Sequence, residues 1–102
     1  LPEEPMMHPN CFRYRFDDDV VQEDVDSALL LAIWGCEALH GEAQTRLDAA
    51  YRVEADRRCC VIDAQTDVGR DLNRLFVGFL SRELGPDTFR VERGAASREA
   101  RA

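Results

Sequence analysis

Apolar residues recur along this chain with two different periods, which indicate both strands and helices. Residues 12–16 alternate aromatic side chains with arginine, as a strand does. Between residues 22 and 40 the apolar residues fall at helical spacing, and Gly41 is a typical residue to follow a helix end. This part of the chain therefore predicts a strand followed by a long helix.

The remainder of the chain follows a similar plan. Residues 43–55 alternate small or apolar with mostly charged side chains, which predicts a long strand, and residues 58–64 predict a shorter apolar one. Thr66 is suited to cap a second helix, which we expect to run to Leu84 and to end at Gly85 and Pro86. Residues 89–92 complete the pattern as a last short strand.

The predicted order is βαββαβ, the split-βαβ or ferredoxin-like arrangement. We therefore expect an α+β domain over residues 11–92, in which two helices cover one face of a four-stranded antiparallel sheet. Residues 1–10 contain three prolines and are expected to form an extended or disordered arm. Residues 93–102 are small and charged, and we expect a disordered tail there.

A tight turn at residues 56–57 would set the register of the two middle strands. It places Tyr51 opposite Ile62 and Val53 opposite Cys60, so both pairs lie on one face. Because all four side chains are apolar, we expect this face to lie under the helices.

The opposite face of the sheet is predicted to carry mixed charge and no aromatic residue. Its charged residues are Arg13, Arg15, Arg46, Asp48, Arg52, Glu54, Asp63, Arg90 and Glu92. An RNA-binding sheet of this topology needs aromatic side chains on that face for base stacking. We therefore reject that class of protein.

Composition further restricts the kinds of partner that we expect. Of the 102 residues, 45% are hydrophobic, which suffices for one core. The net charge is −7, and all 13 basic residues are arginine. Because neutralisation of phosphate charge dominates nucleic-acid affinity, we expect no nucleic-acid partner, and the same argument disfavours an anionic membrane surface. The longest apolar run, residues 28–36, is too short to span a bilayer.

The four cysteines suggest neither a disulfide framework nor a metal centre. No signal peptide is evident, so we expect a cytoplasmic protein with reduced, mostly buried thiols. Cys59 and Cys60 are adjacent in a strand and point to opposite faces, with Cys59 expected to be the exposed one, near Glu54. Cys36 and His40 lie four apart on one helix, but no second pair completes a metal site. We expect no metal and no cofactor.

Both helices carry more apolar residues than one buried stripe requires. We expect the surplus to form an interface: Leu30, Leu31, Trp34 and Ala38 on the first helix, and Val77, Leu80 and Leu84 on the second. The alternative is that the arm and the tail cover these residues. Burying about six such side chains contributes on the order of 10–15 kcal/mol, against an association cost of about 4–15 kcal/mol. The sequence thus favours a non-enzymatic protein that interacts with itself, as a homodimer, or with another protein.

The start of the second helix is where a small-molecule site would be expected. Asp63, Thr66, Gly69 and Arg70 lie where a strand ends and a helix begins, a place where an anion can dock. An ordinary helix cap, with glycine allowing close packing, is the competing interpretation.

Two alternatives to the homodimer therefore remain open. One is a ligand-sensing regulatory module that uses this helix start, and the other is an acidic chaperone or adaptor for another protein. No catalytic motif is evident in the sequence, which argues against an enzyme.

Overall fold

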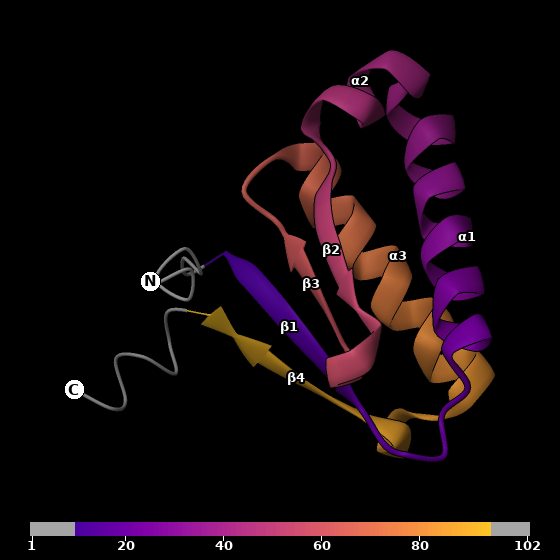
Figure 1. Cartoon of the computed structure of the whole chain (residues 1–102). Coiled ribbons are helices and arrows are strands. Elements are labelled where there is room, and N and C mark those ends of the chain that lie inside the picture. Colours follow the sequence, from indigo (N-terminus) through magenta and orange to yellow (C-terminus); the bar gives the residue numbers. More distant parts are fainter. Residues whose placement is uncertain (1–9, 95–102) are drawn as a thin grey trace.

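A computed structural model of the protein describes residues 10–94 (Figure 1). The predicted arm and tail fall almost entirely on residues 1–9 and 95–102, outside the described residues. The strands are β1 (Cys11–Phe16), β2 (Ala50–Glu54), β3 (Cys59–Asp63) and β4 (Phe89–Arg93). The helices are α1 (Gln22–His40), α2 (Glu42–Asp48) and α3 (Asp67–Leu84).

The strands form one antiparallel sheet with the order β2-β3-β1-β4. Figure 1 shows α1 and α3 side by side on one face of this sheet, with α2 following the end of α1. The predicted α+β class and the four-stranded antiparallel sheet are therefore confirmed. The third helix departs from the expected βαββαβ pattern.

Helix α2 replaces the first half of the strand predicted for residues 43–55, so that prediction is wrong there. Gly41, with φ at +90°, ends α1 and redirects the chain. The residues that follow then form a short helix. Within it Arg46 Nη2 forms an ion pair with Glu42 Oε2, one turn earlier, over 2.7 Å. The alternating pattern places Leu47 among the apolar positions of a strand. In the structure Leu47 lies on α2 and is 77% exposed, so the alternation does not reflect burial here.

Strands β2 and β3 pair in the predicted register, with Tyr51 opposite Ile62 and Val53 opposite Cys60. The connection between them is longer than predicted, since a 3₁₀ turn precedes Arg58, which has a φ of +54°. The connection consists of residues 55–58 instead of 56–57, so each strand is shorter by one residue at this end. Because both strands lose the same number of residues, the same pairs still lie opposite each other.

The core lies between the helices and the sheet. Tyr14 of β1 is the largest of the fully buried side chains, and its ring packs edge-on against Phe76 of α3 at a centroid distance of 4.9 Å. Its hydroxyl donates a hydrogen bond to Asn73 Oδ1 over 2.5 Å. The other buried core residues are Phe16, Val20, Val25, Ala28, Leu29, Ala32, Cys36, Cys60, Ile62, Val68, Leu72 and Leu80.

Candidate functional site

The side of α1 that faces away from the core carries large apolar side chains. Trp34 is 56% exposed, Leu30 is 46% exposed and Leu31 is 44% exposed, and Ala38 is also exposed. We call these four residues the α1 outer face. All four were predicted interface residues, and the described part of the chain leaves them open to solvent.

The three α3 residues predicted for the same interface lie elsewhere. Leu80 is completely buried in the core, so its assignment to an exposed interface is wrong. Val77 and Leu84 are partly buried and pack against the core. Periodicity predicts a second, exposed apolar face on α3. In the structure the three residues of that face belong to the core or pack against it, so α3 buries one broad apolar face.

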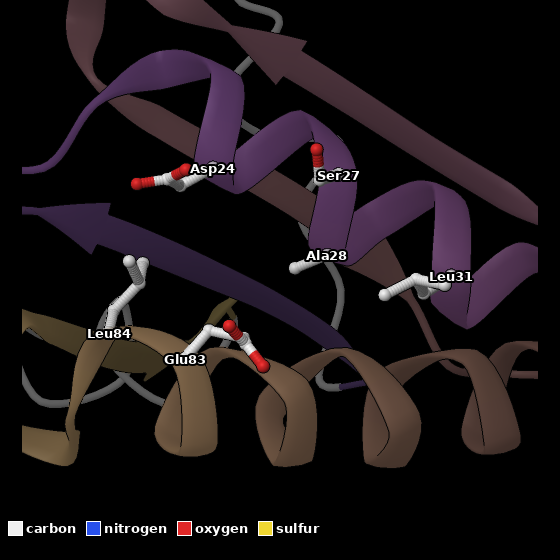
Figure 2. Close-up of a pocket in the computed structure, with 6 residues that line it drawn as sticks. All are labelled: Asp24, Ser27, Ala28, Leu31, Glu83 and Leu84. Carbon is white, nitrogen blue, oxygen red and sulfur yellow. The ribbon is translucent and has the colours of Figure 1, made fainter.

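A cleft of about 250 Å³ lies between α1 and the end of α3. Figure 2 shows Asp24, Ala28 and Leu31 along α1, with Glu83 and Leu84 of α3 across from them. Leu31 therefore belongs both to the α1 outer face and to this cleft. The lining of this cleft is half polar, and two of its polar residues are carboxylates.

The helix side of β2 is a second apolar surface, and it was not predicted. Tyr51 is 46% exposed and Val53 is 37% exposed, although Ile62 and Cys60, which lie opposite them on β3, are completely buried. The expectation that the helices cover this face is therefore wrong at β2. The reason is its position, since β2 is an edge strand and β3 an inner one.

A cleft of about 220 Å³ joins this strand to α1 and α2. It is lined by Ile33, Glu37, Thr45, Arg46, Ala49 and Tyr51. Thr45 is only 2% exposed, and its Oγ1 has no hydrogen-bond partner in the described part of the chain. Ile33 of α1 and Tyr51 of β2 therefore border the same cleft, together with the charged residues Glu37 and Arg46.

The predicted ligand site at the start of α3 is occupied by the chain's own groups. Thr66 Oγ1 accepts a hydrogen bond from the Gly69 amide over 3.0 Å, which caps the helix. A Cβ on Gly69 would lie 2.2 Å from the backbone oxygen of Asp63, so glycine allows the helix to approach the strand. Arg70 forms an ion pair with Asp67 in the same turn. These contacts favour the interpretation as an ordinary helix cap.

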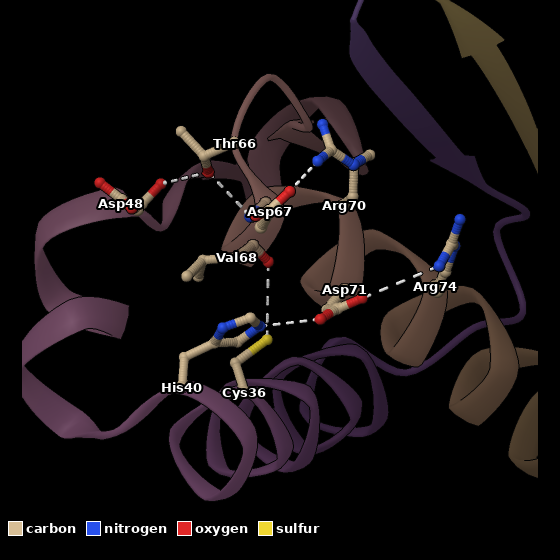
Figure 3. Close-up of polar contacts among 10 residues, drawn as sticks. Cys36, His40, Asp48, Thr66, Asp67, Val68, Arg70, Asp71 and Arg74 are labelled. Carbon is tan, nitrogen blue, oxygen red and sulfur yellow. Dashed lines mark hydrogen bonds and ion pairs between the residues drawn. The ribbon is translucent and has the colours of Figure 1, made fainter.

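A second group of polar contacts ties α1 to α3 (Figure 3). His40 Nε2 lies 2.7 Å from Asp71 Oδ2, and Arg74 Nη1 lies 3.9 Å from the other carboxylate oxygen. Cys36 Sγ donates to the backbone oxygen of Val68 over 3.7 Å. Burial, and then the charge of Asp71, raises the pKa of the Cys36 thiol. Cys36 and His40 therefore each contact α3 instead of sharing a ligand.

Three arginines border a cleft of about 240 Å³ beside the first turns of α3. Its lining residues are Asn10, Phe12, Ala64, Arg70, Asn73, Arg74 and Arg93. The Arg93 guanidinium lies over the Phe12 ring, 5.3 Å from its centroid. Of the four residues predicted to bind a ligand, Arg70 is the one that reaches this cleft.

All four cysteines are buried, and none of them forms a disulfide within residues 10–94. The expected exposure of Cys59 is wrong, since this residue is only 4% exposed on an inner strand. Its Sγ does contact Glu54, donating to Oε1 over 3.1 Å, and burial and this hydrogen bond both raise the pKa of the Cys59 thiol. Burial also raises the pKa of Cys60 to about 12. Both thiols are therefore poor nucleophiles.

Within residues 10–94, no group of three or more His, Cys, Asp or Glu side chains is placed to hold a metal ion. The same residues include no helix that is both long and apolar enough to cross a membrane. Comparison of the chain with protein-family models, with curated proteins and with solved structures finds no match.

Proposed function

We propose that this protein is a non-enzymatic interaction domain that forms a homodimer through the α1 outer face. The observation that carries the proposal is the exposure of Trp34, 56% of whose surface is open to solvent beside Leu30 and Leu31. A cluster of exposed large apolar residues marks an interaction site more often than isolated ones do. Tryptophan is also among the residue types most enriched at positions that dominate binding energy.

The chemistry of this face suits a second copy of the chain. The protein carries a net charge of −7, so two copies repel each other at long range. The four residues of the α1 outer face carry no charge, so a contact centred on them brings apolar side chains together. A two-fold dimer requires such a self-complementary patch.

Replacement of Trp34 by arginine tests the proposal. We expect sedimentation equilibrium to show a dimer for the native chain, and a dissociation constant at least about thirtyfold higher for Trp34→Arg. Because the indole is largely exposed, the variant should retain the native circular dichroism spectrum.

Val91→Arg serves as the matched control, since Val91 is 42% exposed and lies on β4, at the opposite edge of the sheet from β2. This variant should dimerise like the native chain. A native chain that stays monomeric at high concentration, or a Trp34→Arg variant that dimerises normally, would contradict the proposal.

The arginine-lined cleft supports a second candidate function, the binding of a small anion. Arginine binds carboxylate and phosphate groups through paired hydrogen bonds, and three arginines meet at this cleft in an otherwise acidic chain. Inorganic phosphate and citrate should then raise the melting temperature of the native chain, and this shift should be smaller for Arg74→Ala than for Arg82→Ala. Equal shifts in the two variants would exclude this cleft as the binding site.

We also assign the fold to a ferredoxin-like variant and the protein to the cytoplasm. The strand order supports the first assignment, since β3 separates β1 from β2 and β1 separates β3 from β4, with α2 as an addition. Four buried cysteines without disulfides support the second, because reduced thiols are typical of the cytoplasm.

A further inference from the structure

We infer that β2 of one subunit pairs antiparallel with β2 of a second copy, so that the two four-stranded sheets join into one continuous sheet. This inference rests on the proposed homodimer and specifies its geometry. The strand pairing brings the helix layers of both copies to the same side of the joined sheet.

The backbone of β2 has an open side. Two hydrogen bonds at the ends of the β1–β3 pair, from Phe16 N to Arg58 O and from Ala64 N to Asn10 O, show that the even-numbered residues on the β3 side bond to β1. Because successive residues in a strand point their backbone groups in opposite directions, the odd-numbered residues of β3 bond to β2.

The register then identifies the open groups on β2. Glu54 lies opposite Cys59 and Arg52 lies opposite Val61, so these two residues of β2 use their backbone groups to bond β3. Tyr51 and Val53 therefore direct their N–H and C=O groups to the outer edge. Such an edge is a template for another strand, and β2 has no proline and no bulge to block it.

The charges along this edge favour a two-fold axis at Val53 over one at Arg52. A two-fold axis at Val53 places Arg52 of each copy opposite Glu54 of the other, giving two cross-strand ion pairs. A two-fold axis at Arg52 would instead place two arginines opposite each other, which is unfavourable. In the single chain the two side chains already meet, with Arg52 Nε 2.7 Å from Glu54 Oε2. The Arg52 side chain is 55% exposed and the Glu54 side chain is 20% exposed, so Arg52 is the more accessible of the two to a partner strand.

The side chains on the helix side fit the same arrangement. With the axis at Val53, the two valines face each other across the junction. Tyr51 of each copy flanks this pair on the same face, because it is two residues away in the strand. Both residues are partly exposed in the single chain, 46% for Tyr51 and 37% for Val53, and the pairing would remove part of that apolar surface from water.

Charge reversal at the two positions tests the pairing directly. Arg52→Glu and Glu54→Arg should each raise the dissociation constant of the homodimer at least about tenfold, since each variant opposes like charges twice. An equimolar mixture of the two variants should form a heterodimer with an affinity close to native. The double variant R52E/E54R should also regain the native affinity, and it has the native net charge.

Two further variants serve as a control and as an independent check. Arg90→Glu reverses an exposed charge on β4, the opposite edge strand, and should leave dimerisation unchanged. Because Glu54 contacts Cys59, Glu54→Arg risks a folding defect, and Val53→Pro provides an independent variant. Proline there removes an outward N–H while sparing the bonds to β3, so a folded monomer is expected.

The outcomes separate this inference from the proposed function. A native dimer that is weakened by Trp34→Arg, but not by Arg52→Glu or Val53→Pro, would overturn the β2 pairing and leave the α1 outer face as the contact. Single variants that fail to restore each other in the mixture would likewise overturn it. A monomeric native chain would overturn both.

Discussion

Two glycines of α3 have very different surroundings, although they lie on one helix. A Cβ on Gly69 would lie 2.2 Å from a backbone oxygen at the end of β3, whereas a Cβ on Gly78 would have no heavy atom within 4 Å. We expect Gly69→Ala to lower the free energy of unfolding by about 3 kcal/mol, since backbone must move. Gly78→Ala should raise it by about 0.5–1 kcal/mol, because alanine favours the helix.

Urea denaturation of the two variants checks this pair of effects. Equal effects of the two substitutions would show that the close approach of α3 to β3 does not limit the size of the side chain at position 69.

A second effect at the residue scale comes from Cys60. Burial, and to a smaller extent the charges of Cys59, Asp26 and Glu54, raises the pKa of its thiol from 9.0 to about 12. The unfolded chain therefore loses this proton above pH 9, while the folded chain keeps it. The stabilisation is complete below pH 9 and is lost as the pH rises toward 12.

Thermodynamic measurement across this pH range tests the role of Cys60. The free energy of unfolding should fall by up to about 1.4 kcal/mol per pH unit between pH 9 and 12 because of this thiol. In Cys60→Ala the fall should be correspondingly shallower, whatever the variant loses at neutral pH through packing. The same slope in both proteins would show that Cys60 titrates normally in the fold.

At the scale of elements, the two long helices begin differently. Thr66 caps α3 through its hydroxyl, whereas Val21 at the start of α1 provides no side-chain cap. Val21 is 52% exposed and has the extended backbone of a cap residue. We expect Val21→Ser to stabilise the protein by about 0.5–1 kcal/mol, and Thr66→Ala to destabilise it by about 1 kcal/mol, in denaturant unfolding. A neutral or destabilising Val21→Ser would show that the first turn of α1 is satisfied in another way.

At the scale of the whole molecule, self-association links stability to concentration. If dimerisation accompanies folding, a hundredfold increase in protein concentration should raise the melting temperature by about 5 °C. Trp34→Arg should abolish this dependence, because the variant should melt as a monomer. Calorimetry over a concentration series measures both, and a constant melting temperature for the native chain would count against the dimer.

Local patterns in the sequence were sufficient for much of the fold. The helical spacing of residues such as Val25 and Leu29, and the glycines that end the helices, are local information, so α1 and α3 were predicted correctly. The register of β2 and β3 also followed from the sequence, because a shift by one residue would turn Tyr51 and Val53 away from the face of Ile62. Counting apolar residues beyond one buried stripe likewise predicted an outward-facing apolar surface on α1.

Which of these surfaces is covered depends on how the elements pack together. Leu80 and Trp34 both looked like surplus apolar residues, yet Leu80 is completely buried and Trp34 is 56% exposed. Tyr51 is open because β2 lies at the edge of the sheet, and Cys59 is enclosed because β3 lies inside it. Periodicity gives the direction of a side chain relative to its own element, whereas burial depends on which other elements lie on that side.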